Sequence, residues 1–428
     1  MTTALVVAAL LLMLAIGTPV GFAMAAAGSL GLILTGGVDA LLGVLQTTPL
    51  SIVSSYELIT IPMFMLMAEF VLLSGVADDL FRATAAWVGN IRGGLGMATA
   101  VAGAGFGAIC GTSTASAATL SATSLPAMLK HGYEPKLAAG VVAISGTLAM
   151  LIPPSIAMVV YGLIADVNIG KLLVGGVIPG LLVTLVIMGT VWFLVWQDPA
   201  RAPSSGKTPL CERLRLLRIV GPMIALFGAV TGIIYSGIAT PTEASALGAF
   251  VAMLQAWRSG KMTAEGLRRA VLKAAHGSCM IVMILLGASI FGYFFALTQV
   301  SQDLVQWVGG LDVSRWVVLL LLLCGYMLLG AFMDQIAILI LTVPIVVPLV
   351  QSLGFDLVWF GVIIIVVAEM GMVTPPVGLN CFIVSRYSGR PVGEVFRGTT
   401  PHVVAHLAAI ALLVVFPQLI LWLPSHMQ

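Results

Sequence analysis

The chain has 428 residues, of which 60% are hydrophobic and 8% are charged, and its mean hydropathy is +1.12. A soluble domain carries roughly 25% charged residues, so this composition excludes a soluble enzyme, a disordered chain and a nucleic-acid-binding protein with a basic surface. Because a membrane-crossing helix needs about 20 apolar residues, the chain is long enough for on the order of a dozen spans. The net charge of +2 is informative only through its distribution along the chain.

Apolar segments recur along the whole chain, separated by glycine, proline and small charged clusters. Hydropathy predicts membrane spans at about 3–17, 18–35, 56–75, 135–164, 172–197, 218–236, 242–257, 277–299, 355–384 and 399–423. Two further apolar stretches, 93–129 and 312–350, are interrupted midway by small or polar residues. Each is long enough for two half-helices, which predicts a re-entrant hairpin. Such hairpins are tolerated only inside protein or beside a water-filled cavity.

The basic residues orient these segments. The charged clusters at 78–92, 130–136, 198–218, 258–273 and 386–397 can share one side of the membrane if both ends of each hairpin lie on its own side. That side then holds 17 of the 19 basic residues, and only Lys171 and Arg315 lie opposite. By the positive-inside rule this side is cytoplasmic. We therefore expect the first hairpin to enter from the cytoplasm and the second from outside, with both chain ends outside.

An internal repeat supports these opposite orientations. An offset of 222 residues aligns Pro126, Gly132, Pro153-Pro154, Gly176 and Pro179 with Pro348, Gly354, Pro375-Pro376, Gly398 and Pro401. Because five spans separate the hairpins, the two copies are inverted. Inverted repeats with broken helices are typical of secondary transporters, whose site lies near the bilayer midplane. The sequence predicts an all-α polytopic membrane protein with two inverted repeats, each with a re-entrant hairpin and a Pro-Pro broken helix.

Tandem prolines mark the predicted breaks at 135–164 and 355–384. A proline inside a helix removes the bond to the carbonyl four residues earlier, so the prolines free carbonyls in both repeats. These are the carbonyls of Ala149, Met150, Gly371 and Met372. Unwound carbonyls can coordinate sodium, and the alternative is a kink repaired by water or by neighbouring Ser and Thr. Because the breaks are repeat-related and face polar hairpins, we favour ion sites.

The interruption of the first hairpin is rich in hydroxyl groups. Thr112, Ser113 and Ser116 follow Cys110-Gly111, and helix N-termini attract carboxylates. We expect these three residues to bind an anionic substrate or an ion, whereas the alternative is a small-residue packing face. Asn380, four residues beyond Pro376, is predicted to bond substrate or to brace the break.

Ionisable residues at membrane depth are functional candidates by default. Asp334 interrupts the second hairpin and Glu369 precedes Gly371, and either a structural or an ion-shell role suits each. Glu69 could equally be a structural anchor. Glu57 and Glu243 are expected near an interface, without a functional role.

His402 and His406 are spaced i, i+4 on one helix face, a spacing that suits a metal. No Cys, Asp or third His accompanies them, so a metal is disfavoured. The sequence also contains no His-Glu-x-x-His, Gly-x-Ser-x-Gly or Walker A motif. An intramembrane enzyme using these histidines or Glu369 is therefore a minor alternative.

An ordered series of motifs resembles a known family. It comprises Thr18-Pro-Val-Gly-Phe-Ala23, Gly111-Thr-Ser-Thr-Ala-Ser-Ala-Ala118, Gly132-Tyr133, Leu151-Ile-Pro-Pro-Ser-Ile156, Tyr161-Gly162, Ile178-Pro-Gly180, Ala239-Thr-Pro-Thr-Glu-Ala244, Gly330-Ala-Phe-Met-Asp334 and Gly371-Met-Val-Thr-Pro-Pro-Val-Gly-Leu-Asn380. Over nearly the whole chain this series resembles the large membrane subunit (DctM-type) of tripartite ATP-independent periplasmic (TRAP) transporters.

The resemblance implies an elevator-type transporter fold in which a scaffold supports a moving domain that carries both hairpins. We expect scaffold helices at 1–76, the first repeat at 77–197, a cytoplasmic loop with central scaffold helices at 198–276, and the second repeat at 277–428. The resemblance also implies a periplasmic binding protein (DctP-type) and a small membrane subunit (DctQ-type). The sequence has no extra segment of about four spans, so we expect that subunit to be a separate chain.

The resemblance further implies sodium ions, two or more, bound mainly by backbone oxygens. Carried onto this sequence, one ion lies near Cys110, Ser113, Ala149, Ile152 and Pro154. The other lies near Gly330, Gly371, Thr374 and Val377. The family often has Ser where Cys110 stands and Gly where Ala149 stands, but backbone ligation tolerates both changes.

The function that follows is sodium-coupled import of an organic acid, such as a C4-dicarboxylate or a sugar acid, across the bacterial inner membrane. No organic cofactor is expected. The alternative is a stand-alone sodium/dicarboxylate symporter of the same ion transporter superfamily.

Overall fold

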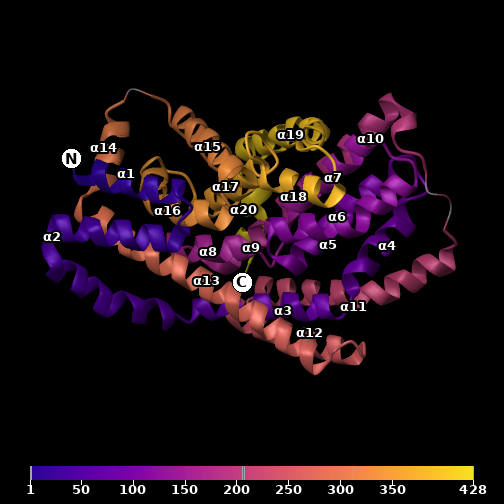
Figure 1. Cartoon of the computed structure of the whole chain (residues 1–428), viewed down its shortest axis with the longest axis horizontal. Coiled ribbons are helices and arrows are strands. Elements are labelled where there is room, and N and C mark those ends of the chain that lie inside the picture. Colours follow the sequence, from indigo (N-terminus) through magenta and orange to yellow (C-terminus); the bar gives the residue numbers. More distant parts are fainter. Residues whose placement is uncertain (1, 205, 207, 312, 428) are drawn as a thin grey trace.

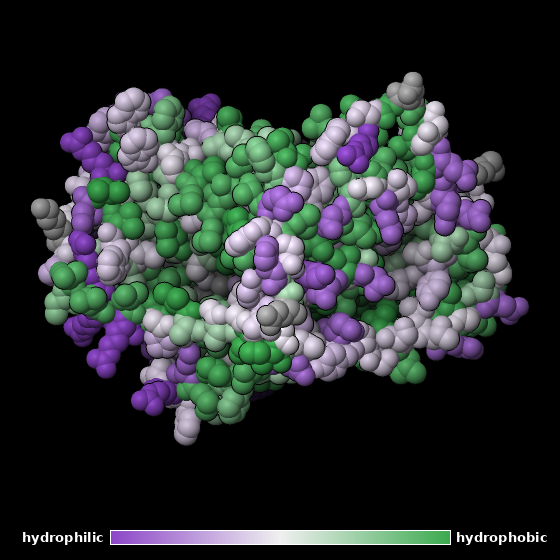
Figure 2. Space-filling model, turned by 180° about the vertical axis from the view of Figure 1, so that it is seen from behind, coloured by the Kyte–Doolittle hydropathy of each residue, from purple (hydrophilic) through white to green (hydrophobic). Residues whose placement is uncertain are grey.

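A computed structural model describes residues 2–204, 206, 208–311 and 313–427. Within these residues the regular elements are all helices (Figure 1). Seven helical segments of this part of the chain are long and apolar enough to cross a membrane, and shorter apolar helices accompany them. Hydrophobic residues cover much of the face in Figure 2, and hydrophilic residues lie at both ends and in a patch near the middle. The predicted all-α polytopic membrane fold is confirmed.

The two predicted hairpins are both present. The first consists of α5 (Gly94–Cys110) and α6 (Ser113–Lys130), and the second of α15 (Arg315–Phe332) and α16 (Gln335–Ser352). Two residues join the arms in each case, so each chain reversal is tight. Residue 312, where the second predicted range began, lies outside the described residues. The interruptions seen in the sequence are therefore the turns between the two arms.

Each hairpin is followed by a helix that breaks at its proline pair. In the first repeat α7 (Pro135–Gly146) continues into η2 (Thr147–Met150) and resumes as α8 (Ile156–Ala165). In the second, α17 (Leu357–Gly371) resumes as α18 (Leu379–Ser388). The intervening residues are non-helical because neither proline can donate a helical hydrogen bond, and both Pro–Pro peptide bonds are cis.

The offset of 222 residues found in the sequence also relates the helices. It takes the last residue of α5 to that of α15, and the first residues of α6 and α7 to those of α16 and α17. Gly132 and Gly354, which the offset also aligns, both have a left-handed backbone, with φ of 78° and 76°. The repeat is thus a repeat of backbone conformation.

The two repeats interlock. The second arm of each hairpin packs on the distal half of the other repeat's broken helix, α6 on α18 and α16 on α8. In addition, α7 crosses α19 (Val392–Val415), where a methyl group added to Gly140 would lie 2.3 Å from the carbonyl carbon of Gly398. Lipid offers no hydrophobic force between helices, so such close packing of small residues holds them together.

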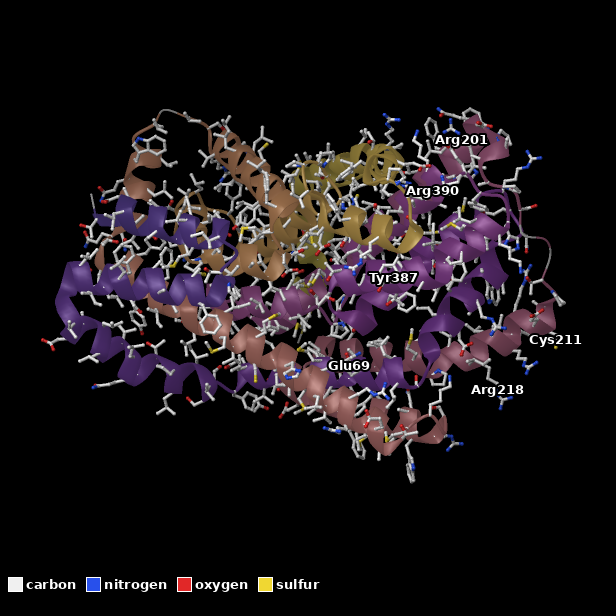
Figure 3. The ribbon with its side chains drawn as sticks, in the orientation of Figure 1. Glu69, Arg201, Cys211, Arg218, Tyr387 and Arg390 are labelled. Carbon is white, nitrogen blue, oxygen red and sulfur yellow. The ribbon has the colours of Figure 1, made fainter. Side chains whose placement is uncertain are left out.

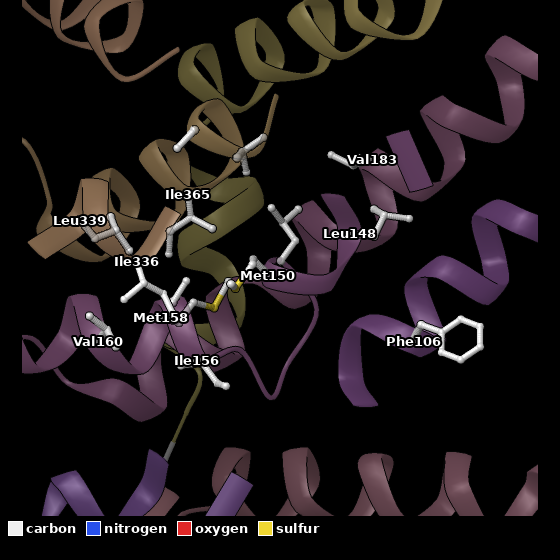
Figure 4. Close-up of a cluster of buried hydrophobic side chains, with 14 of the residues drawn as sticks. Phe106, Leu148, Met150, Ile156, Met158, Val160, Val183, Ile336, Leu339 and Ile365 are labelled. Carbon is white, nitrogen blue, oxygen red and sulfur yellow. The ribbon is translucent and has the colours of Figure 1, made fainter. Parts of the chain in front are cut away.

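Buried apolar side chains fill the space between the repeats (Figure 4). Met158 of α8 lies beside Ile336 of α16 and near Ile365 of α17 in that view, and all three are at most 3% exposed. The shared core therefore joins the two repeats into one body.

A second group of helices packs alongside this body. Within it α2 (Val20–Val53) runs along α13 (Ala264–Leu297), and α3 (Thr60–Leu73) packs on α12 (Pro241–Arg258) and α13. The expected division between 276 and 277 falls inside α13, which is continuous. Close approach at Gly287, where a methyl group would lie 2.1 Å from the carbonyl oxygen of Gly21, joins α13 to α2.

Nine further elements complete the described part of the chain. They are α1 (Thr2–Ala15), η1 (Glu57–Ile59), α4 (Val76–Val88), α9 (Ile169–Gly175), α10 (Val177–Gln197), η3 (Pro199–Arg201), α11 (Leu210–Tyr235), α14 (Val300–Gly309) and α20 (Gln418–Ser425).

Several predicted spans have different limits, and three of them illustrate the causes. The span at 18–35 extends to Val53 through a kink at Gly37, whose φ of 76° and ψ of −179° only glycine adopts readily. The span at 277–299 begins at Ala264 because the polar first turns of α13 are also helical. The last span, 399–423, is two helices, and α19 ends before Pro417. Hydropathy identified the apolar cores of these helices but not their ends.

Three of the basic residues predicted on the cytoplasmic side are labelled in Figure 3. In Figure 3 Arg201 and Arg218 lie toward one end of the molecule, whereas the N-terminus and α14 lie at the opposite end in the same orientation (Figure 1). The side of the membrane on which these residues lie stays a prediction.

Candidate functional site

The tip of the first hairpin carries two buried hydroxyl groups. Gly111 makes the turn with a φ of 60°, and Thr112 is extended and makes no side-chain cap bond. Ser113 and Ser116 lie in the first turn of α6 and are 1% and 0% exposed. Among the described residues the Ser116 hydroxyl has no hydrogen-bond partner. The tip therefore offers an unpartnered hydroxyl beside the positive end of a helix.

Ser113 reaches across to the other repeat. Its hydroxyl donates a hydrogen bond to Oε2 of Glu369 on α17. Glu369 is fully buried, and its other oxygen, Oε1, has no partner among the residues that the structure describes. A buried carboxylate oxygen without a partner is costly, so this position has capacity for a further polar or charged group.

The tip of the second hairpin is held differently. Asp334 caps α16 by accepting a hydrogen bond from the Ile336 amide at 3.1 Å. The Gly378 amide donates to the Ala331 carbonyl at 3.0 Å, which ties the hairpin to its own broken helix. The cap role predicted as one alternative for Asp334 is therefore present.

Close backbone packing brings each hairpin to its break. A methyl group added to Gly330 would lie 2.4 Å from the Ala368 carbonyl oxygen and 3.1 Å from Cα of Gly371. In the first repeat, a methyl group on Gly107 would lie 2.9 Å from Cα of Ala149. Gly330 and Gly371, both predicted from the family's sodium sites, are thus in contact, and the predicted Ala149 contacts Gly107 of the first hairpin.

The prolines were predicted to free four carbonyls, and three of these accept hydrogen bonds from other groups of the protein. The Met150 carbonyl accepts a hydrogen bond from the Ser155 hydroxyl at 2.5 Å. The Gly371 carbonyl accepts one from the backbone N–H of Thr374 at 2.9 Å, and the Met372 carbonyl accepts one from the backbone N–H of Asn380 at 3.1 Å. The prolines remove only the helical donors, and local groups replace them. A carbonyl oxygen has two lone pairs, so these three can still accept a second partner.

Other carbonyls at the two breaks have no donor. In the part of the chain that the structure describes, no hydrogen bond goes to the carbonyl oxygens of Ala149, Ile152, Pro154, Gly330, Thr374 and Val377. Six of the residues predicted to bind sodium therefore share this property. Ala149, Pro154 and Gly330 are buried, and a buried carbonyl needs a partner, whereas Thr374 and Val377 are only half-buried.

Asn380 lies in the first turn of α18, where α18 packs against α6. It is fully buried, and neither its Oδ1 nor its Nδ2 has a partner among the described residues. An amide placed in this way can both donate and accept. The structure thus adds a second unpartnered polar group on the helix that faces the first hairpin.

Thr374 is part of the second break. Its hydroxyl donates to the Met370 carbonyl at 2.5 Å, which leaves its lone pairs available. The side chain of Cys110, the first residue of the other predicted set, lies outside the described residues.

Several candidates lie away from this region. Glu69 forms an ion pair with Lys273 at 3.5 Å, Glu57 accepts from the Ser55 hydroxyl at 2.8 Å, and Glu243 completes a capping box with Thr240. These three acidic residues have local structural partners.

The two histidines, His402 and His406, are buried on α19. No group of three or more metal-ligating side chains occurs among the described residues. The structure therefore adds no third ligand to this pair.

One buried polar residue was missed by the sequence reasoning. Gln335 is fully buried at the start of α16, where its Nε2 donates to the Ile365 carbonyl at 3.3 Å and its Oε1 has no partner among the residues described. The offset of 222 aligns it with Ser113, and that alignment could have identified it.

Comparisons with known proteins agree with this architecture. Residues 7–419 match the family model described as "Tripartite ATP-independent periplasmic transporter, DctM component". The chain is 34% identical to a C4-dicarboxylate TRAP transporter large permease protein of Pseudomonas aeruginosa, over 86% of each chain. It is 30% identical to a sialic acid TRAP transporter large permease protein of Vibrio cholerae, over 96% of this chain and 95% of that one.

The fold also resembles a solved structure. The crystal structure of the Alcanivorax borkumensis YdaH transporter matches with a TM-score of 0.64 and 15% identity, over 89% of both chains. This similarity concerns the fold alone. The relatives are named as permease subunits, so the protein is a transport protein and not an enzyme. Its broken helices, its paired hairpins and the match over residues 7–419 show that the chain belongs to the DctM component family of tripartite ATP-independent periplasmic transporters.

Proposed function

We propose that the chain is the permease subunit of a sodium-coupled transporter that imports an organic acid. The observation that carries the proposal is the set of donor-free carbonyls at the two Pro-Pro breaks, directly beside the hairpin tips. A secondary transporter needs an ion site and a substrate site close together, and broken helices provide both kinds of group.

Two sodium sites would use these carbonyls. One would lie among Ser113, Ala149, Ile152 and Pro154, with Cys110 as a further ligand. The other would lie among Gly330, Gly371, Thr374 and Val377. Sodium is a hard cation that prefers oxygen ligands, and unwound carbonyls supply them without adding charge. The contacts of Gly107 with Ala149 and of Gly330 with Gly371 support this grouping.

The substrate would be a carboxylate. The positive end of α6, the free hydroxyl of Ser116 and the free amide of Asn380 suit a group that accepts and donates hydrogen bonds. Thr112 and Ser113 complete the polar tip. Two relatives are named for C4-dicarboxylates and for sialic acid, both of which carry carboxylates. The shared chemistry is therefore an organic acid.

Movement would follow the elevator scheme, with the interlocked repeats shifting as one body against the outer helices. Cavities along the boundary between these groups support this scheme. A cavity of about 450 Å³ lies between Glu57 and Thr242 on one side and Asp166 on the other. A second, of about 360 Å³, lies between α13 and the end of α8. A loosely packed boundary is easier to slide than the close contacts inside the repeats.

The partners would be a separate small membrane subunit and a periplasmic binding protein, together in the bacterial inner membrane. The experiment is uptake of a labelled C4-dicarboxylate or sialic acid into liposomes that contain this chain and its small subunit, with the cognate binding protein outside. We expect uptake to require an inward sodium gradient. Equal uptake with potassium or choline would overturn sodium coupling, and equal uptake without the binding protein would support a stand-alone symporter.

A further inference from the structure

The side chain of Glu369 has a position that neither the repeat nor the proline pairs explain. Among the described residues, it is the only one of the other repeat whose side chain forms a hydrogen bond with the first hairpin tip. The bond joins residues 256 positions apart in the sequence. It therefore depends on how the two repeats are packed together.

Glu369 also lies next to the second predicted sodium site. It precedes Gly371 by two residues on α17, and its neighbour Ala368 shares with Gly371 the close contact with Gly330. Ser113, to which Glu369 is bonded, belongs to the first predicted site. The Glu369 side chain thus contacts Ser113 of the first predicted site, and the helix that carries Glu369 also carries Gly371 of the second.

The surroundings of Glu369 leave it few ways to relax. The residue is 0% exposed, as are the neighbouring Ala368 and Met370. Its Oε1 has no partner among the described residues, so the bond from Ser113 is the hydrogen bond recorded for its side chain. In a low-dielectric interior, such a bond is strong and its loss is costly. A shift of the hairpin tip on ion binding must therefore move Glu369, and with it the end of α17.

From this geometry we infer that Glu369 is a positioning residue that couples the two sodium sites, so that an ion bound in one repeat favours binding in the other. The inference rests on the proposed function. Two sites coupled in this way bind cooperatively, and coupling changes affinity by roughly 5- to 150-fold. The coupling runs from Ser113 through its hydrogen bond to Glu369, and then along two residues of α17 to Gly371.

The experiment measures radioactive sodium binding to the purified full-length chain in a choline background, which gives both the number of ions bound and the Hill coefficient. We expect two ions per chain and a Hill coefficient well above 1 for the wild type. Glu369→Leu should still bind two ions, with a Hill coefficient of about 1 and a half-saturation about tenfold higher. Glu369→Gln should keep cooperativity because its amide oxygen still accepts from Ser113.

A matched control comes from the other repeat. The offset of 222 aligns Glu369 with Thr147, which is equally buried but donates to the Ile144 carbonyl of its own helix. Thr147→Val should leave the Hill coefficient unchanged. If Glu369→Leu does not fold, Glu369→Met removes the same bond with an unbranched side chain of similar length and should lower the Hill coefficient to about 1 with two ions still bound.

Two results would overturn the coupling. One is a wild-type Hill coefficient of 1 with two ions bound, and the other is unchanged cooperativity in a folded variant that lacks the bond. Both differ from failure of the proposed function, in which the wild type would bind no sodium.

Discussion

The two repeats have the same backbone but unequal chemistry. Every polar group gathered around the first hairpin tip has a repeat-related counterpart, and most counterparts are apolar or form only local bonds. The pairs related by the offset of 222 are Ser113 and Gln335, Ser116 and Ile338, Asn380 and Met158, and Glu369 and Thr147. The repeat symmetry therefore accounts for the hairpins and the helix breaks. Different side chains make the contact of α6 with α18 polar and the contact of α16 with α8 apolar.

The crossed packing explains where the polar groups meet. Because α6 packs on α18, Ser116 and Asn380 belong to one boundary between repeats, and because α16 packs on α8, Ile338 and Met158 belong to the other. The second boundary is dry and apolar, with both residues fully buried. We interpret the first boundary as the place for substrate and the second as the rigid joint.

The largest effect that separates the repeats is expected at Gly371. A methyl group there would lie 2.5 Å from the Met327 carbonyl oxygen and 2.7 Å from Cα of Gly330, and neither backbone atom can move freely. Gly371→Ala should destabilise the protein by about 3 kcal/mol, measured by thermal unfolding in detergent. Ala149→Gly, at the related position of the first repeat, should cost at most about 1 kcal/mol. Equal losses would show that the two hairpin contacts are equivalent.

Methionine is the residue that the first repeat has at the position related to Asn380, namely Met158. Asn380→Met removes a buried side-chain amide that has no hydrogen-bond partner among the described residues, so stability should stay the same or rise by about 1 kcal/mol. Uptake in liposomes should nevertheless fall at least about tenfold, because the polar boundary loses a substrate-bonding group. Met158→Leu is the matched control and should transport normally. Undiminished uptake by Asn380→Met would remove this residue from the substrate site.

The caps of the second hairpin arms differ, and the difference can be measured. Asp334 accepts from the Ile336 amide, whereas Thr112, at the related position, makes no side-chain cap bond. Asp334→Ala should cost about 1 kcal/mol of stability, and Thr112→Ala much less.

A second substitution separates the cap from an ion-shell role. Asparagine is also a good cap, so Asp334→Asn should keep both stability and sodium half-saturation if Asp334 acts only as a cap. A raised sodium half-saturation in this stable variant would place the carboxylate in the ion shell.

The smallest effect concerns Thr374. Its related residue in the first repeat is Ile152, which can contribute only a backbone oxygen. Thr374→Ala should raise the sodium half-saturation of transport about threefold through loss of one oxygen ligand, equivalent to roughly 0.7 kcal/mol. Ile152→Val should leave it unchanged. An identical sodium dependence in Thr374→Ala and wild type would count against a hydroxyl ligand.

Much of this architecture follows from local sequence signals. The hairpin turns coincide with Gly111-Thr112 and Met333-Asp334, and the helix breaks coincide with the two proline pairs. The first turn and both breaks are predictable because glycine and proline act on the backbone within a few residues, and the second turn is predictable because aspartate is a good helix cap. Helix ends were less predictable: the polar first turns of α13 and the Gly37 kink of α2 carry no hydropathy signal.

By itself, the sequence determined the membrane setting, the inverted repeat and the positions of the turns and breaks, since composition, spacing and backbone breakers act locally. Only the tertiary structure determined which helices of one repeat pack on which helices of the other. The bond between Ser113 and Glu369, the donor-free carbonyls beside Gly330 and the buried amide of Asn380 all depend on α6 crossing to α18 and α15 closing on α17. Contacts between residues far apart in the chain are set by packing, and no local pattern encodes them.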